Sequence, residues 1–236
     1  MLIQQMFNGQ LPQLVMFDLD GTLVDSIPDL AAAIDQVLLE YGKPCAGVEK
    51  ASHWIGNGVP LLVQRALKDA GFSEQEYALE SPHLQQALSD FSAAYDQTNG
   101  HHTTIYPGVI TCLEALQKAG VTLALITNKS ERFTHRLLEL IHLQHYFALV
   151  VCGDSLIDEQ GNAIRKPDPK ALLHVIHKLK AQPENTLMVG DSRHDIEAAK
   201  AAGVTSVAVP YGYNHGEPVQ LFKPDYLVSS LDQLFA

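Results

Sequence analysis

Cysteine and basic residues are scarce in this sequence, and each shortage narrows what the protein can be. The three cysteines, Cys45, Cys112 and Cys152, are far apart and show no C-x-x-C spacing. This excludes a disulfide-rich scaffold and indicates reduced thiols in a cytoplasmic protein. Sixteen lysines and arginines against 27 aspartates and glutamates give a formal net charge of -11. Because a phosphate backbone requires a basic face, we expect no nucleic-acid partner.

Long apolar runs and internal repeats are also missing from the chain. No apolar stretch approaches the length that a membrane span requires, so we expect no membrane insertion. Residues 1–13 contain no basic region followed by an apolar run, which argues against a signal peptide and for a cytoplasmic location. The eleven histidines include no group with an evident third ligand nearby, so we expect solvated side chains rather than a metal site.

What is present predicts a globular α/β protein. The chain has 236 residues, of which 46% are hydrophobic and 18% charged, enough for a sizeable core. Strand patterns alternate with helical patterns and are found at 15–17, 121–127, 148–152, 186–189 and 206–209. Such alternation is typical of a doubly wound, parallel, Rossmann-like sheet. Residues 27–99 show helical periodicity and no strand pattern. We therefore expect an α/β core of residues 1–25 and 101–236, and a helical cap of residues 26–100 inserted after the first strand.

Asp18 and Asp20 end the first apolar strand, in the stretch VMFDLDGTLVDS. Strand alternation places their side chains on one side and Leu19 on the other. Isolated buried charge is strongly disfavoured, so we expect a divalent cation to compensate the two carboxylates. One carboxylate could then attack a substrate while the other moves protons. An ordinary Asx turn after a strand is the alternative.

Further polar residues follow the later strands at corresponding places. Thr127 and Asn128 follow the second strand, Lys166 lies in the loop after the third, and Asp191 and Asp195 follow the fourth. In a parallel sheet these positions share one edge, where ligands bind. Taken singly, they could be helix caps, a solvated loop lysine and carboxylates favoured by a helix dipole. Their occurrence together favours a catalytic site, and a cap leaving from that edge is expected to act as a lid.

The segments FDLDGT, TN, KP and GDSRHD resemble the four motifs of the haloacid dehalogenase-like phosphatase superfamily. The resemblance covers the whole chain, including the helical cap after the first motif. Within the superfamily, WIGNGVPLLVQRAL and YGYNHGEP are similar to segments of bacterial phosphatases that act on 2-phosphoglycolate. The resemblance therefore implies a Mg²⁺-dependent phosphomonoester hydrolase with a small phosphate ester as its substrate, most simply 2-phosphoglycolate. A monomer or a small homo-oligomer is expected.

The resemblance also implies roles for the residues at the sheet edge. Asp18 would attack phosphorus and form an aspartyl-phosphate, and Asp20 would serve as general acid and then as general base. The Asp18 and Asp191 carboxylates and the Asp20 backbone carbonyl would hold Mg²⁺. Asp195 would position Lys166 or a metal-bound water.

The phosphate and the rest of the substrate require further partners. Lys166, Thr127 and Asn128 are expected to bind the phosphoryl oxygens, with Lys166 also neutralising charge that develops in the reaction. In the cap, the candidates for the substrate carboxylate are Arg65 and the loop residues Gly56, Asn57 and Gly58. Arg65 also fits a solvated position on an amphipathic helix, and that alternative stays open.

Four other functions remain to be weighed. The enzyme could act on another small phosphorylated metabolite, or be a hexose-phosphate mutase on the same core and cap, which would give isomer and little free phosphate. A non-catalytic phosphate-binding module is disfavoured by the complete set of Asp18, Asp20, Lys166 and Asp191. A dehalogenase is disfavoured because Asp20, Asp191 and their implied metal would have no role in it.

Overall fold

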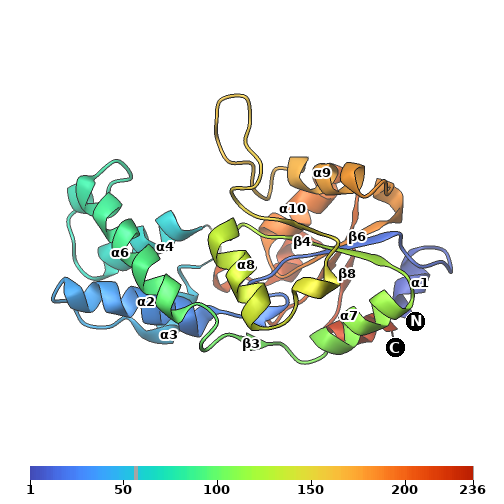
Figure 1. Cartoon of the computed structure of the whole chain (residues 1–236), viewed down its shortest axis with the longest axis horizontal. Helices are drawn as coiled ribbons and strands as arrows, with labels where there is room; N and C mark the ends of the chain where they lie inside the picture. Colours follow the sequence, from blue (N-terminus) through green and yellow to red (C-terminus); the bar gives the residue numbers. More distant parts are fainter. Residues whose placement is uncertain (56–57, 236) are drawn as a thin grey trace. The chain divides into compact units, whose positions relative to one another are not determined.

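The computed structural model describes residues 1–55 and 58–235, and its contacts divide the chain into two compact units. The first unit combines Met1–Asp25 with Ile105–Ala236, and the second is Ser26–Thr104 (Figure 1). Two of the expected substrate-binding residues, Gly56 and Asn57, lie outside the described residues. Within the described chain, no helix is both long and apolar enough to cross a membrane.

The first unit contains a six-stranded parallel sheet in the order β5-β4-β1-β6-β7-β8. The strands are β1 Leu14–Phe17, β4 Thr122–Ile126, β5 Leu149–Val151, β6 Thr186–Gly190, β7 Thr205–Ala208 and β8 Tyr226–Leu227. The chain first builds outward from β1 to β4 and β5, and then builds β6, β7 and β8 on the other side. This is the doubly wound order, in which the direction of winding reverses beside β1. The predicted fold class is confirmed.

Alternation along the strands divides the core of this unit into two apolar layers. Val15 and Phe17 of β1 face one layer, whereas Leu14 and Met16 face the other. The first layer includes buried residues of α7, Val109–Lys118, and α8, Glu131–Leu140. The second includes those of α9, Lys170–Lys178, and α10, Arg193–Ala202. A strand covered on both faces is fully buried, as all four residues of β1 are.

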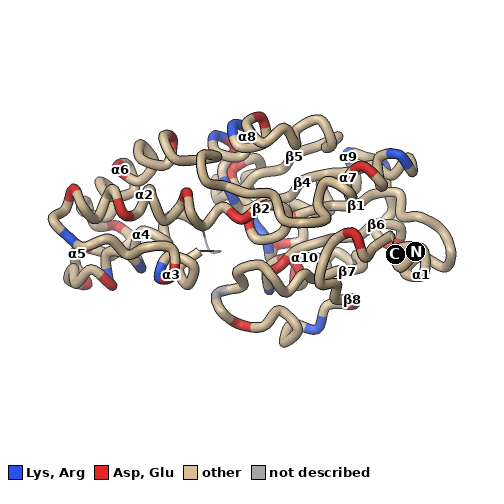
Figure 2. The backbone as a smooth tube through the Cα atoms, turned by 90° about the horizontal axis from the view of Figure 1, so that it is seen from below, with Lys and Arg blue, Asp and Glu red and all other residues tan. Residues whose placement is uncertain are grey.

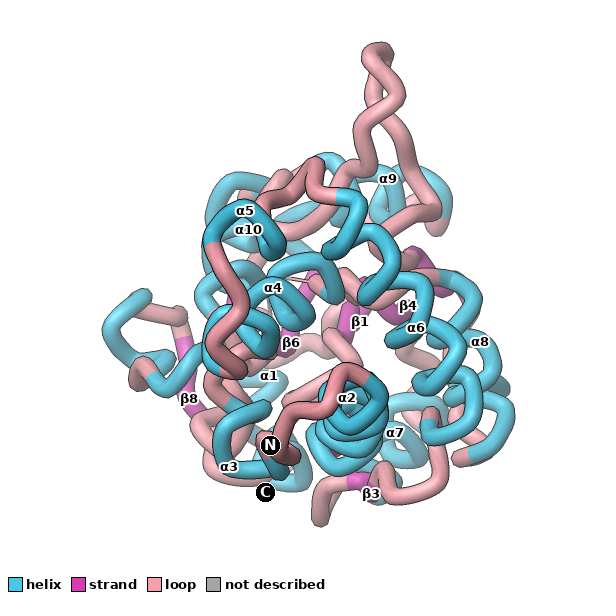
Figure 3. The backbone as a smooth tube through the Cα atoms, turned by 90° about the vertical axis from the view of Figure 1, so that its left-hand side faces the viewer, coloured by secondary structure: helices cyan, strands magenta, loops and turns pink. Residues whose placement is uncertain are grey.

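The segment between β5 and α9 projects from the first unit as a narrow loop, which is visible in Figures 1 and 3. Its two arms meet at an isolated antiparallel bridge between Ile157 and Ala163. Asp158 stabilises the tip by accepting hydrogen bonds from the backbone N–H groups of Gln160 and Asn162, at 3.0 and 2.7 Å. The return arm of this polar loop leads to Lys166.

The second unit is built of helices around α2, Ile27–Glu40, which packs against α6, Pro82–Thr98. The other helices are α3 Gly47–Ser52, α4 Val59–Asp69 and the short α5 Glu74–Tyr77. Leu30, Ile34, Val37 and Leu38 recur at helical spacing along α2, and all four are buried. At the start of α5, Ser73 and Glu76 form a capping box, which their three-residue spacing allows.

Two short helices were not predicted from the sequence. They are α1, Leu2–Met6, and α3, and both are shorter than the windows in which periodicity is informative. The start of α3 is stabilised from outside the helix. The Asp35 carboxylate of α2 accepts hydrogen bonds from the backbone N–H groups of Ala46 and Gly47, at 2.6 and 3.1 Å. A cap that lies on another helix leaves no local signal.

Asp29 is a fully buried carboxylate in the first turn of α2. It accepts hydrogen bonds from the backbone N–H groups of Gly100, His102 and Thr103, at 2.8, 2.7 and 3.0 Å, and from the Thr103 hydroxyl at 2.6 Å. Four donors compensate the loss of hydration. Asp29 thereby holds the end of the second unit against its beginning.

We predict that Asp29→Asn lowers the free energy of unfolding of the second unit by about 2–3 kcal/mol, because an amide N–H₂ would face backbone donors. Trp54 is the only tryptophan in the chain and lies in this unit, so its fluorescence during urea unfolding measures the change. Asp69→Asn is the matched control, since Asp69 is exposed and only forms a surface ion pair with Lys50. Equal effects of the two substitutions would contradict the prediction.

Candidate active site

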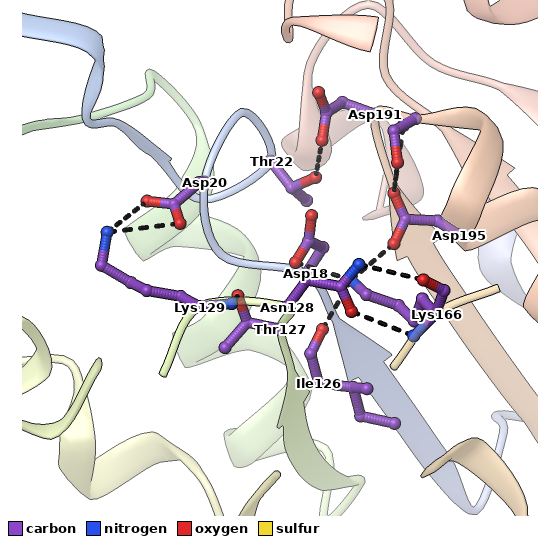
Figure 4. Close-up of polar contacts among 11 residues, drawn as sticks. Asp18, Asp20, Thr22, Ile126, Thr127, Asn128, Lys129, Lys166, Asp191 and Asp195 are labelled. Atoms are coloured by element: carbon purple, nitrogen blue, oxygen red, sulfur yellow. Dashed lines mark hydrogen bonds and ion pairs between the residues drawn. The ribbon is translucent and has the colours of Figure 1, made fainter. Parts of the chain in front are cut away.

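The polar residues predicted at the carboxyl ends of the strands converge in the first unit (Figure 4). Asp18 follows β1, Thr127 follows β4 and Asp191 follows β6, while Asp195 lies in the first turn of α10. All four side chains are buried. Figure 2 shows acidic and basic residues side by side in the region between β2, Val24–Asp25, and α10. The carboxyl ends of the parallel strands, together with the start of α10, bring these side chains to one edge of the sheet. This is the edge at which ligands bind in such folds.

Lys166 is the centre of the cluster. Its Nζ atom lies 2.7 Å from Asp18 Oδ1 and 2.7 Å from Asp195 Oδ1, and it donates a hydrogen bond of 2.8 Å to the Ile126 carbonyl. An ammonium group has three N–H donors, so these three acceptors match its capacity. Burial alone would lower the pKa of Lys166, but the Asp18 and Asp195 carboxylates raise it above its ordinary value. Lys166 is therefore charged.

Asp195 is held at both oxygens. Oδ1 contacts Lys166, and Oδ2 accepts hydrogen bonds from the Ser192 backbone N–H and hydroxyl at 3.0 and 2.6 Å. Ser192 and Asp195 also form the capping box of α10, so the helix start and the lysine contact share one carboxylate.

Asp191 is held by backbone and hydroxyl donors. Its Oδ1 atom accepts a hydrogen bond from the Thr22 hydroxyl at 3.0 Å, and Oδ2 accepts one from the Tyr213 backbone N–H at 2.7 Å. Gly21 and Gly212 pass so close that a Cβ on either would collide with the Asp191 carboxyl group. Burial, followed by the charge of Asp195, raises the pKa of Asp191 to about 7. Among the described residues, both hydrogen-bond donors to the Asp191 carboxyl group are neutral.

The acidic cluster suits a divalent cation. One carboxylate oxygen from each of Asp18, Asp191 and Asp195 lies within 4.8 Å of the others. Burial raises the pKa of Asp18 well above its ordinary value, and Lys166 offsets only part of that rise. A cation would relieve the charge that Lys166 leaves uncompensated. Asp195 pairs with Lys166 through Oδ1 and caps α10 through Oδ2, whereas the hydrogen-bond donors described for Asp191 are neutral and Asp18 contacts Lys166 through Oδ1. Asp18 and Asp191 are therefore better suited than Asp195 to hold the cation.

Thr127 and Asn128 form hydrogen bonds with other residues of the chain. The Thr127 hydroxyl accepts a hydrogen bond from the Lys129 backbone N–H at 3.1 Å. The Asn128 amide pairs with the main chain of Lys166 in both directions, donating to its carbonyl at 3.0 Å and accepting from its N–H at 2.9 Å. The role of Asn128 in binding phosphoryl oxygens stays a prediction. In the structure, its side chain fixes the loop that carries Lys166.

Lys129 was missed by the sequence analysis. Its Nζ atom lies 3.2 and 3.4 Å from the two carboxylate oxygens of Asp20, and its side chain is only 6% exposed. A lysine directly after the Thr-Asn pair was the available signal. The segment around Tyr211 was noted only for its resemblance to related phosphatases, and its residues were given no role at the site. The Tyr211 hydroxyl donates a hydrogen bond to the Thr22 carbonyl at 2.8 Å, and the Tyr213 hydroxyl donates one to the Asp25 carboxylate at 2.9 Å.

The remaining candidates lie in the second unit. Gly58 is the N-cap of α4 with φ of 87°, a conformation that favours glycine. Arg65 donates a hydrogen bond from Nη1 to the Trp54 carbonyl at 2.7 Å. A pocket of about 300 Å³ is lined by Trp54, Arg65, Lys68 and Asp69. Arg65 is thus half-buried and bonded to the chain, which argues against the fully solvated alternative.

A doubly wound sheet with buried acids and a lysine at its carboxyl edge defines an α/β enzyme core. Residues 15–209 match the family model of haloacid dehalogenase-like hydrolases. The chain belongs to that family.

Similar proteins cover nearly the whole chain. A phosphoglycolate phosphatase of Pseudomonas putida is 47% identical over 231 residues, covering 98% of this chain and 81% of its own length. Phosphoglycolate phosphatase 1 of Pseudomonas aeruginosa is also 47% identical, with 97% and 80% covered. A crystal structure of a predicted phosphoglycolate phosphatase from Haemophilus somnus superposes with a TM-score of 0.84 at 33% identity, with 94% and 96% covered.

We predict that the metal-free protein loses stability as the pH rises. The pKa of Asp191 increases on folding from its ordinary 3.8 to about 7, so folding favours the protonated form. The contribution of protonated Asp191 to the free energy of unfolding is fully present below about pH 4, and it is lost as the pH rises through about 7. With a chelator at pH 8, Asp191→Asn should raise the free energy of unfolding by about 1–3 kcal/mol, since one pKa unit corresponds to about 1.4 kcal/mol.

Urea unfolding from pH 4 to pH 8 provides the measurement. The asparagine can retain both contacts of Asp191, because the Thr22 hydroxyl can accept as well as donate. Asp225→Asn is the control, because Asp225 is exposed and accepts hydrogen bonds from Ser206, so its replacement should only destabilise. An Asp191→Asn protein less stable than the parent at pH 8 would refute the argument.

Proposed function

We propose that this hydrolase converts 2-phosphoglycolate to glycolate and inorganic phosphate, with Mg²⁺ as its cofactor. The observation that carries the proposal is the buried cluster of Asp18, Asp191 and Asp195 around Lys166. Relatives at 45–47% identity that are named phosphoglycolate phosphatases support the choice of substrate.

The reaction proceeds by two displacements at phosphorus. Asp18 attacks the phosphoryl group, the bond from phosphorus to the ester oxygen breaks, and Asp20 gives that oxygen a proton. Asp20 then takes a proton from water, which attacks the aspartyl-phosphate and releases phosphate and the free Asp18 carboxylate. Lys166 holds Asp18 in place for both steps, since its ammonium contacts Oδ1 at 2.7 Å.

The residues around Asp18 are proposed to bind the metal ion and the phosphoryl oxygens. Asp18, Asp191 and the Asp20 carbonyl are the groups suited to hold Mg²⁺, which when bound neutralises charge on the phosphoryl oxygens. Thr127 and the backbone N–H groups after Asp18 lie at the same sheet edge and are assigned to the phosphoryl oxygens. Asn128 acts through Lys166, whose main chain it holds.

Phosphate release from small phosphomonoesters tests the proposal. The set contains 2-phosphoglycolate, 3-phosphoglycerate, glucose 1-phosphate and glucose 6-phosphate, each with Mg²⁺ and with EDTA. We expect a preference for 2-phosphoglycolate that EDTA abolishes. Preference for another ester would show that 2-phosphoglycolate is the wrong substrate, but it would leave the proposed hydrolysis mechanism in place. Isomerisation of a glucose phosphate without phosphate release would indicate a mutase.

Asp18→Asn should reduce turnover of 2-phosphoglycolate by about 10⁴-fold or more, because an amide cannot form the covalent intermediate. The fold should persist, since the substitution removes a buried charge. Asp168→Asn is the control: this half-buried carboxylate, two residues after Lys166, contacts only Lys170 among the described ion pairs, and turnover should change less than about twofold. A folded, active Asp18→Asn protein would exclude Asp18 as nucleophile.

Gly212→Ala should weaken Mg²⁺ binding about 10- to 100-fold, because the added methyl group displaces the Asp191 carboxyl group. Calorimetric titration with Mg²⁺ measures the change. Gly203→Ala is the control, since its φ of 69° makes alanine unfavourable there but nothing lies within 4 Å of the new Cβ. That variant should lose about 1 kcal/mol of stability and keep its Mg²⁺ affinity. Unchanged affinity in Gly212→Ala would show that Asp191 does not bind the metal.

A further inference from the structure

The site contains a second lysine that the reaction scheme does not use. Lys129 Nζ lies 3.2 and 3.4 Å from the two oxygens of Asp20, and the exposed fractions of the two side chains are 6% and 19%. Figure 4 shows Lys129 reaching Asp20 on the side of the site away from Lys166. The two ammonium groups therefore serve different carboxylates.

The position of Asp20 indicates what Lys129 can reach. Under the proposed function, Asp20 protonates the ester oxygen that leaves phosphorus, so that oxygen lies within hydrogen-bonding distance of its carboxylate. Whatever is bonded to the leaving oxygen must then lie beside Asp20. Lys129 is already in contact with Asp20, and an ammonium group can contact more than one anionic oxygen at once, as Lys166 does.

The leaving group of 2-phosphoglycolate carries a carboxylate one methylene group from the ester oxygen. We propose that Lys129 binds this carboxylate, so that the first unit itself selects phosphate monoesters of 2-hydroxy acids. The inference rests on the proposed function and extends it, because it assigns substrate selection to a residue of the sheet edge. A buried ammonium is well suited to this, since it meets little competition from water.

Arg65 was the other candidate for this carboxylate. Its Nη1 atom already donates to the Trp54 carbonyl at 2.7 Å, and the pocket beside it contains a carboxylate, that of Asp69, as well as Lys68. Each candidate cation thus lies near a carboxylate, Arg65 near Asp69 and Lys129 against Asp20. Lys129 is favoured because its carboxylate partner is the one that the proposed reaction places beside the leaving oxygen.

Two substrates separate binding of the carboxylate from effects on Asp20. Ethyl phosphate has the same phosphate and methylene groups as 2-phosphoglycolate but a methyl group in place of the carboxylate. We expect Lys129→Met to lower the ratio of kcat/KM for 2-phosphoglycolate to that for ethyl phosphate about 10- to 100-fold. Lys129→Arg should restore part of the ratio, because it restores the charge. Lys170→Met, which removes an exposed lysine, should leave the ratio unchanged.

Equilibrium binding gives a second measurement that does not depend on turnover. In the Asp18→Asn background, Lys129→Met should weaken binding of 2-phosphoglycolate and leave that of ethyl phosphate within about twofold. Circular dichroism establishes that each variant is folded, and Lys129→Gln replaces Lys129→Met if the latter is not.

The possible results are distinct. If Lys129→Met reduces activity on both substrates equally, Lys129 only positions Asp20 and the proposal is overturned. If Arg65→Met lowers the ratio and Lys129→Met does not, the carboxylate is bound by the second unit, and the proposal is equally wrong. If the unmodified enzyme hydrolyses both esters equally well, 2-phosphoglycolate is not its preferred substrate. The proposed function is then wrong, and so is the proposed role of Lys129.

Discussion

The structure of the site depends on the burial of carboxylates around one lysine. Lys166 contacts Asp18, Asp195 and a backbone carbonyl, and it is almost inaccessible to water, with 2% of its side chain exposed. Removing several charges from water is costly unless each has partners in good geometry. The chain meets this requirement with short contacts to Lys166 and Ser192, whereas the donors to Asp191 among the described residues are neutral. The arrangement serves chemistry at the expense of stability.

Close backbone approach is what keeps the carboxylates in place. Gly21 and Gly212 lie against Asp191, and Gly190 lies against Asp195, each so close that a Cβ would collide with the carboxylate side chain. A side chain enclosed by backbone has few alternative rotamers, so its oxygens stay fixed while the reaction changes the charge beside them. Preorganised groups of this kind do not have to rearrange in the transition state. The glycines therefore contribute to the site as much as the acids do.

The sequence predicted those parts of the structure that are encoded locally. Buried strands and amphipathic helices have their own periods, and the sheet edge follows from parallel connections, so the positions of Asp18, Thr127 and Asp191 could be foreseen. The contacts of Asn128 with Lys166, and of Asp29 with residues 100–103, could not. They join residues 38 and up to 74 positions apart, and no local pattern specifies such pairs. Lys129 was overlooked for the same reason, since its partner Asp20 precedes it by 109 positions.

Charge balance explains why an acidic chain can bind an anionic ester. The side chains in Figure 4 include four carboxylates, those of Asp18, Asp20, Asp191 and Asp195, and two ammonium groups, those of Lys129 and Lys166. With all of them ionised, the cluster carries two negative charges more than positive ones, which opposes a phosphate dianion. A divalent cation cancels that excess, and a monovalent one does not. The raised pKa of Asp191 reflects the same excess, because burial and the neighbouring carboxylate both favour a proton where no cation is bound. The number of charges that the fold gathers at this sheet edge therefore supports the proposed Mg²⁺, before any property of the substrate is considered.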